Sequence, residues 1–514
     1  MKSFKYIIGA ALVALCCSSC IKDLDTNPID PSINTPDKSL NKPEAYFALL
    51  AQCYSGFGTS GPYGPNGANI ISGIDGGFSQ YFRGRYHLNG LTTDETVCGW
   101  NDQTLQDLHG FAWVSNDVFV AAFYYRIGYQ ISACNEFIRQ ANIATISLPE
   151  KERWIAEAKA LRAFCWYDAI DNFGGFPFAD ENSKVGAESP KYISRAELFE
   201  YIESQCKELL DGDALFDMHT APYGRVDKGM VTMLLSKLYL NAEVYTGTPK
   251  YAEALALLKT MDGKYDLHDN FNELFLADNH LCTEELIFTI EQDGIYVQSY
   301  GATNYLCFAC TGGSMDAAAM GISSGWGGLR ATPEMYRKFA SDDKRALFWT
   351  EGQKEEIDDI SDFTNGIAYT KFRNVNHDGS PAKANGFVDI DFPVYRYADA
   401  LLMRAECGVR LNGSSDQDAL AAYRKVRTRA GLSTPSSITL SDILDERARE
   451  LALEGWRRSD LIRFGLFTSA DYVWAWKGGV KTGKGVDSHF NLFPLPYNDV
   501  QANTNLQEHQ NPGY

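Results

Sequence analysis

The chain has 514 residues, of which 45% are apolar and 22% charged. A chain of this balance can bury a large core, which argues against disorder as its dominant state. Its net charge of −19 makes nucleic acid and anionic membrane surfaces poor partners, because both attract clustered Lys and Arg.

The N-terminus predicts an export signal. A start with two lysines precedes the apolar run Ile7–Leu15, which is too short to span a bilayer, since spanning takes about 20 residues. This pattern is typical of a secretory signal. Cys17-Ser18-Ser19-Cys20 resembles a bacterial lipoprotein box. We therefore predict a signal peptide over residues 1–19 and lipidation of Cys20; the alternative is an ordinary signal with incidental cysteines.

Loops are predicted first along the mature chain, and helices after them. Residues 20–45 are predicted to form an extended tether, because Pro, Asn, Asp, Ser and Thr are frequent there. Gly56–Gly90 is dense in Gly, Tyr and Phe and predicts ordered loops. Capping boxes are predicted at Ser147–Glu150 and Ser194–Glu197, each ahead of apolar residues at helical spacing. Further predicted helices are Lys228–Tyr245, Lys250–Met261, Tyr397–Leu411, Asp416–Ala430 and Ser441–Gly455.

The helices come in neighbouring pairs, with Ala at close-packing positions and aromatic residues opposite, which is typical of tetratricopeptide-type pairs. We predict a mainly α fold with one domain over residues 46–514. Its helical-pair frame covers about 115–275 and 394–470. Loop-rich parts cover about 56–110 and 281–393, the second of them containing short strands, and loops on a rigid scaffold are where binding sites tend to lie.

No catalytic residue, metal site or cofactor is predicted. Cys307 and Cys310 form a C-x-x-C without a second pair at zinc spacing, and the other body cysteines are predicted to be small buried side chains. Gly321–Gly325 matches G-x-S-x-G but lacks the strand and helix that a nucleophile elbow needs. A glycoside hydrolase with paired carboxylates stays an alternative, although 66 acidic residues produce such pairs by chance.

Aromatic and polar residues in the loops indicate a sugar site. Sugar rings present flat C–H faces and many hydroxyls, so they favour exposed aromatic faces beside planar polar groups. The alternative for each ring is that it fastens a loop to the core. The candidate residues are Trp100, Tyr300 and Trp326 for stacking, and Asp75, Arg83 and Gln103 for hydrogen bonding.

Four sequence motifs resemble the SusD/RagB family of outer-membrane nutrient-binding lipoproteins from Bacteroidetes. They are Ala160–Pro177, Tyr395–Glu406, Glu446–Gly465 and Phe493–Tyr514. The resemblance runs from Cys20 to Tyr514 and implies helical pairs carrying a glycan site on a loop-built surface. It also implies a lipid anchor in the outer membrane, facing the cell exterior, and a SusC-like TonB-dependent transporter as partner. The charged stretch after Cys20 is similar to the surface-export signal of such lipoproteins.

The resemblance to the family's founding starch binder implies a more specific ligand. Tyr300 and Trp326 match two positions of its aromatic arc, and Asp75 and Arg83 match polar contacts. The third arc position falls at Cys98, with Trp100 two residues further on, and Gln103 replaces an Asn. The expected ligand is a starch-like or related α-glucan. The alternatives are another polysaccharide or a peptide with the same transporter-lid role.

Overall fold

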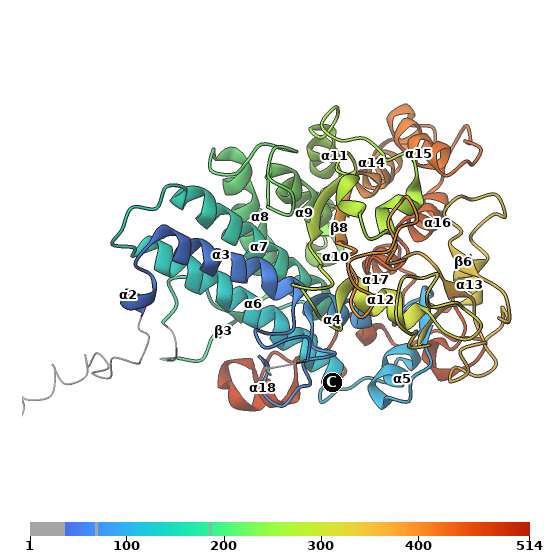
Figure 1. The fold of residues 1–514 in the computed structure, drawn as a ribbon, viewed down its shortest axis with the longest axis horizontal. Helices are drawn as coiled ribbons and strands as arrows, with labels where there is room; N and C mark the ends of the chain where they lie inside the picture. The colour runs from blue at the N-terminus through green and yellow to red at the C-terminus, as the bar shows by residue number, and fades with distance from the viewer. Residues whose placement is uncertain (1–35, 67–69, 185, 187) are drawn as a thin grey trace, which may run out of the picture.

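The computed structural model describes residues 36–66, 70–184, 186 and 188–514. The predicted signal peptide and Cys20 lie outside these residues. Helices dominate the fold (Figure 1). The α-helices are α2 (Pro36–Ser39), α3 (Pro43–Gly58), α4 (Tyr81–Asn89), α5 (Gln103–Gly110), α6 (Val118–Asn142), α7 (Lys151–Phe173), α8 (Arg195–Asp211), α9 (Lys228–Leu240), α10 (Ala242–Thr246), α11 (Tyr251–Lys259), α12 (Ala302–Cys310), α13 (Pro333–Tyr336), α14 (Tyr397–Asn412), α15 (Gln417–Arg429), α16 (Leu440–Leu451), α17 (Arg457–Arg463) and α18 (Tyr497–Ala502). Short 3-10 helices are η1 (Phe271–Phe275), η2 (Asn279–Leu281), η3 (Lys477–Gly479), η4 (Ser488–Asn491) and η5 (Thr504–Leu506).

The strands are short and form antiparallel pairs. The four pairs are β1 (Thr96–Cys98) with β5 (Leu329–Ala331), β2 (Phe176–Phe178) with β3 (Lys191–Ile193), β4 (Leu286–Ile290) with β8 (Phe392–Arg396), and β6 (Phe348–Trp349) with β7 (Ala368–Tyr369). The β1–β5 pair joins an N-terminal loop to the 281–393 excursion, so two loop-rich segments far apart in sequence meet at one place.

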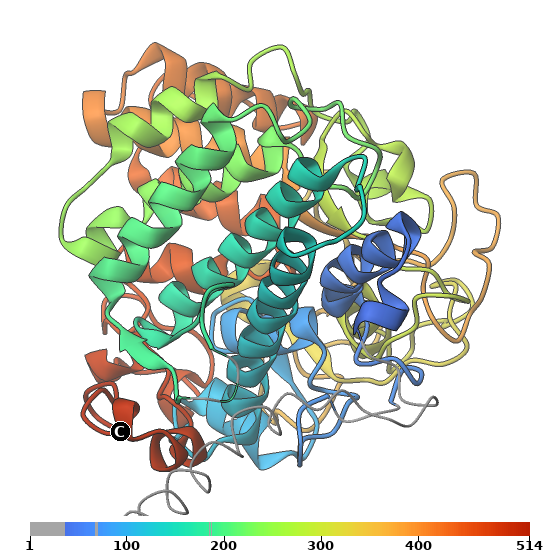
Figure 2. The same ribbon diagram turned by 90° about the vertical axis from the view of Figure 1, so that its left-hand side faces the viewer.

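The helices pack as a series of neighbours, each on the next. α3 packs on α6, α6 on α7, α7 on α8, α8 on α9, α9 on α11, and α11 on α14, which also contacts α15 and α16. Figures 1 and 2 show α6 and α7 lying side by side, and in Figure 1 the loop-rich excursion, with α12, α13 and β6, lies on the side away from α7 and α8. The predicted mainly α architecture of helical pairs is confirmed.

Helix starts agree with the sequence in one case and differ in another. Ser194 and Glu197 form the predicted capping box at the start of α8. The box predicted at Ser147–Glu150 is wrong: α7 begins at Lys151 with Glu150 as its N-cap residue. Because the Glu150 carboxylate accepts hydrogen bonds from Arg153 and from the Trp154 indole, it does not reach back to the backbone of Ser147.

The prediction of loops throughout Gly56–Gly90 is also wrong, because α4 lies inside this tract. Gln80 caps α4 by accepting a bond from the Arg83 backbone N–H at 2.9 Å. All residues of α4 except Arg83 are buried. A helix that is buried all round carries no polar stripe, so the periodicity that identifies surface helices is missing.

Two further observations concern the described residues as a whole. None of their helices is long and apolar enough to cross a membrane. All nine of their cysteines are free and buried, as the sequence predicted for small apolar side chains. Burial raises the pKa of the Cys307 thiol, in the C-x-x-C on α12, to about 12.

Candidate glycan-binding site

Two of the predicted aromatic residues lie beside helix α12, one near each of its ends. Tyr300 lies just before its N-terminus, and the Trp326 loop is fastened to its C-terminal end. There the backbone N–H groups of Trp326 and Gly328 donate to the carbonyls of Phe308 and Ala309, both at 2.8 Å. A Cβ at Gly325 would lie 2.2 Å from the Thr311 oxygen, so only glycine allows the loop this close.

The third ring arrives through the β1–β5 pair. Cys98 pairs with Leu329, and the Gly99 N–H continues the pairing by donating to the Gly328 carbonyl at 2.9 Å. Trp100 follows and donates its indole N–H to the Trp326 carbonyl at 3.1 Å. Cys98 itself is buried, and Trp100 is half-buried beside Trp326. Trp100 therefore lies against Trp326, while position 98 carries no ring.

Four aromatic rings form a continuous series, which we call the aromatic arc: Phe387, Tyr300, Trp326 and Trp100. Neighbouring ring centroids along the arc are 5.5, 6.0 and 6.2 Å apart, within the usual range for interacting aromatic pairs. All four side chains are half-buried. Phe308 supports Trp326 from α12, with centroids 5.0 Å apart. Each ring is thus held by the protein and keeps part of its surface free.

Arg83 and Asp75 border the arc at Tyr300. Arg83 Nη1 donates to the carbonyls of Gly77 and Tyr300, both at 3.0 Å. Its guanidinium lies over the Tyr305 ring at 4.6 Å, while Nη2 takes no part in these bonds. Burial lowers the pKa of Arg83. Asp75 is exposed; its Oδ1 accepts the Gly77 N–H at 2.7 Å and leaves Oδ2 outside that bond.

The structure brings five of the six predicted residues together. Asp75, Arg83, Trp100, Tyr300 and Trp326 are joined by the contacts above. Gln103 is separate: it lies exposed in the first turn of α5, and its amide donates to Asp107 at 2.8 Å. Among the described residues, no hydrogen bond or ring contact links Gln103 to the arc.

Phe387 belongs to the arc and was missed from the sequence. It follows Asn385 and Gly386, so it is an aromatic residue among small and polar neighbours, as Trp326 is. The same signal that selected Trp326 would have selected it. Its place beside Tyr300 depends on the fold, because the 383–391 segment is held by Asn374 and Asp389, with the Asp389 N–H donating to Asn374 Oδ1 at 2.9 Å.

Comparison with known proteins gives a matching family model and relatives with SusD in their names. The SusD family model matches residues 358–514. The starch-binding protein SusD of Bacteroides thetaiotaomicron is 32% identical, over 100% of this chain and 99% of that protein. SusD-like protein P2 of Formosa agariphila is 23% identical over 80% of this chain and 83% of its own length.

Solved structures share the fold. A SusD superfamily protein from Parabacteroides distasonis matches with a TM-score of 0.72 and 22% identity, over 92% of this chain and 99% of that one. Surface glycan-binding protein A from Bacteroides thetaiotaomicron, solved in complex with laminarihexaose, matches with a TM-score of 0.69 and 20% identity, over 91% of this chain and 99% of that one.

Proposed function

The chain belongs to the SusD family, and on that premise we propose that it is a surface lipoprotein that captures an oligosaccharide on its aromatic arc. Delivery to a SusC-like TonB-dependent transporter in the outer membrane is part of the proposal. The observation that carries it is the series of four partly exposed rings, bordered by Asp75 and Arg83. Stacking faces beside a carboxylate and a guanidinium are what a chain of sugar rings needs.

The ligand we propose is a starch-like α-glucan. Two facts support this choice: the 32% identity to a protein named for starch binding, and the presence of a third ring, Trp100, beside Trp326. The rings change orientation along the arc, with interplanar angles of 43°, 57° and 51°. A series of tilted rings suits a curved chain better than a flat one. Flat stacking with few hydrogen bonds gives about −4 to −8 kcal/mol, or millimolar to micromolar affinity.

Calorimetry of the lipid-free protein tests the proposal. We expect heat of binding with maltoheptaose. Trp326→Ala, which removes the central ring, should weaken binding at least tenfold, or about 1.4 kcal/mol. Tyr497→Ala is the control, since Tyr497 is 54% exposed on α18 and outside the arc. Unchanged affinity in a folded Trp326→Ala protein would remove the arc from the proposal.

The same experiment separates the alternatives. Binding of dextran oligosaccharides or laminarihexaose, without maltoheptaose, would keep the arc and change the glucan. No heat of binding with any glucan would discard the α-glucan and leave the two alternatives, another polysaccharide or a peptide. Release of reducing ends on prolonged incubation would favour a hydrolase; we expect none, since the relatives are named as binding proteins and the arc offers stacking and hydrogen bonding rather than a pair of facing carboxylates.

A further inference from the structure

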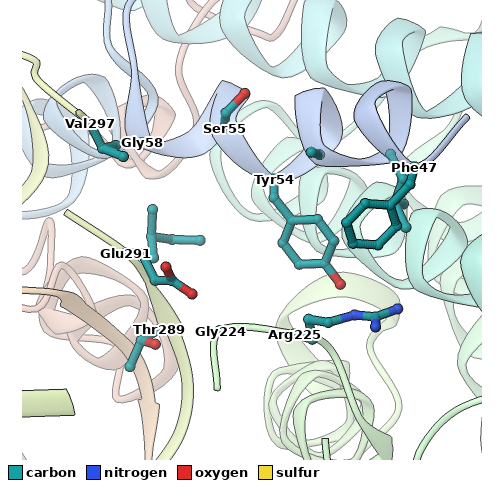
Figure 3. Close-up of a pocket in the computed structure, with 12 residues that line it drawn as sticks. Phe47, Tyr54, Ser55, Gly58, Gly224, Arg225, Thr289, Glu291 and Val297 are labelled. Atoms are coloured by element: carbon teal, nitrogen blue, oxygen red, sulfur yellow. The ribbon is translucent and has the colours of Figure 1, made fainter. Parts of the chain in front are cut away.

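A second cavity lies between α3 and the end of β4, apart from the aromatic arc (Figure 3). Its volume is about 380 Å³, within the range of small-molecule sites. One face of α3 forms a wall through residues three or four apart, including Phe47, Leu50 and Tyr54. Figure 3 shows the Phe47 and Tyr54 rings reaching from α3 toward Arg225, with Glu291 on the facing side.

Glu291 brings a free carboxylate to this cavity. Gly224 has φ +75°, and a Cβ there would lie 2.0 Å from Glu291 Oε1, so the carboxylate fills space that any other residue would occupy. No described residue donates a hydrogen bond to the carboxylate or pairs with it. Partial desolvation raises the pKa of Glu291. Glu291 lines a largely apolar cavity while remaining exposed, so its carboxylate is open to water and to a ligand that can donate hydrogen bonds.

Arg225 supplies a fixed donor on the other side. Its Nε lies 3.1 Å from Glu157 Oε2, and its Nη2 pairs with the same buried carboxylate. The Tyr54 hydroxyl donates to Glu157 at 2.5 Å and accepts the Val226 N–H at 3.1 Å. The guanidinium carbon lies 5.6 Å from the centroid of the Phe47 ring, within cation–π range. Nη1 takes part in none of these bonds, so a rigid guanidinium keeps a donor group available.

A carboxylate, a guanidinium donor and an aromatic ring together favour a ligand that has both hydroxyl groups and an apolar face. A purely apolar molecule would shut the Glu291 carboxylate away from water without a partner, which is costly. A sugar ring would offer hydroxyls to Glu291 and Arg225 and a C–H face to Phe47, which is 44% exposed. The cavity is also close to the arc along the chain, because Val297 lines it and Tyr300 follows three residues later.

We propose that the cavity between α3 and β4 is a second saccharide site, which takes a sugar ring. This inference rests on the proposed function only in assuming that the protein meets glycans; the site itself shares no residue with the arc. The two sites make different demands. The arc offers several aromatic faces for stacking, whereas the cavity offers the Phe47 ring with one carboxylate and one guanidinium.

Fluorine NMR of protein labelled with 5-fluorotryptophan observes both sites at once. The Trp154 ring lies 5.6 Å from the Phe47 ring and reports on the cavity, while Trp100 and Trp326 report on the arc. We expect titration with maltose or maltoheptaose to shift the Trp154 resonance with saturation. Glu291→Gln and Phe47→Ala should each weaken that response at least tenfold and leave the response of Trp100 unchanged. Tyr497→Ala should alter neither response.

Each outcome decides between the two sites. A Trp154 response that survives Trp326→Ala supports the cavity independently of the arc. Shifts confined to Trp100 and Trp326 overturn the second site and leave the proposed function standing. A response of Trp154 alone supports the cavity and removes the arc. A Trp154 response that is unaffected by Glu291→Gln and Phe47→Ala assigns it to binding elsewhere and overturns the inference. A protein whose tryptophans respond to neither sugar overturns it too.

Discussion

Trp100 lies against Trp326 because position 328 carries no side chain. A Cβ at Gly328 would lie 2.7 Å from the Trp100 ring. Gly327, at φ +57°, turns the chain between Trp326 and Gly328. The two glycines therefore allow the two indoles to lie side by side. The hydrogen bond from the Trp100 indole N–H to the Trp326 carbonyl stabilises this contact. The site therefore depends on glycines without side chains as well as on the aromatic rings themselves.

Glu95 makes stability depend on pH. It is 1% exposed and accepts bonds from the Leu453 N–H at 2.8 Å and the Tyr86 hydroxyl at 3.1 Å. Burial raises its pKa from 4.5 to about 7. Between these values the folded protein keeps a proton that the unfolded chain has lost, so stability falls as pH rises from about 4.5 to 7. At about 1.4 kcal/mol per pKa unit, the loss reaches roughly 3 kcal/mol.

Glu95→Gln should therefore flatten this part of the stability curve. We expect the unfolding free energy of the variant to fall less than that of the wild type between pH 5 and pH 8, as measured by chemical denaturation. Some slope should persist, because burial also raises the pKa of Asp391 to about 7. Identical slopes in the two proteins would mean that Glu95 is ionised in the fold throughout this range.

A buried ion network joins β8, α15, α16 and the turn after α16. Arg396 at the end of β8 lies 2.6 Å from Glu285, 3.0 Å from Glu450 and 2.8 Å from Glu454. Arg345 and Arg429 also contact Glu450, and these carboxylates are completely or almost completely buried. Most of the charged residues in the motifs Tyr395–Glu406 and Glu446–Gly465 belong to this network and to its neighbours on α14 and α17.

Arg396→Met tests the network. It removes the positive charge that three buried carboxylates share, and we expect a loss of about 3–5 kcal/mol in stability, since breaking a buried pair leaves uncompensated charge. Arg337→Met is the matched control. Arg337 pairs with Glu355 and Glu356 in solvent, where such pairs contribute about 0–1 kcal/mol. Equal losses in denaturant unfolding of the two variants would contradict a structural role for the network.

At the scale of elements, the sequence predicts long helices well, including the largely buried α9 and α14, but misses the short helix α4. The predicted helix from Asp416 to Ala430 corresponds to α15, one of whose faces is polar. α4 has 9 residues with Gly84 among them and only Arg83 is not buried, so it shows little periodic contrast. The predicted helix Lys228–Tyr245 is divided into α9 and α10 at Asn241. The Asn241 side chain is held by Tyr167 and Arg463, and such tertiary contacts carry no local signal.

The candidate site was predictable as a set of residues but not as a shape. Trp326 stood out as an indole among Gly and Ser, which indicated an exposed ring. Its contact with Trp100 joins positions 226 residues apart through a pair of three-residue strands. Strands this short give no periodic pattern. Neither the order of rings along the arc nor the bridging role of Arg83 follows from spacing in the sequence.

At the scale of the whole molecule, the helical series forms a scaffold, and the loops carry the aromatic arc. In Figure 1 the blue and yellow loop segments meet near α12, away from the long helices α7 and α8. The β1–β5 pair fastens these segments to each other, and Arg83 on α4 fastens Tyr300 to the frame. A glycan bound on the arc would therefore meet a preorganised surface, which limits the entropy lost on binding.

Capture at a cell surface also requires an anchor, and we propose lipidated Cys20 for that role. We expect wild-type protein in its native host to sediment with the outer membrane, because two or more acyl chains hold a protein stably in a bilayer while one does not. Cys20→Ala should shift it to the soluble fraction, as measured by immunoblotting of fractionated cells. Cys16→Ala, just outside the lipoprotein box, is the matched control and should leave it in the membrane. A Cys20→Ala protein that still sediments would mean that the anchor lies elsewhere. If the purified Cys20→Ala variant binds glycan with unchanged affinity, anchoring and capture are separate functions.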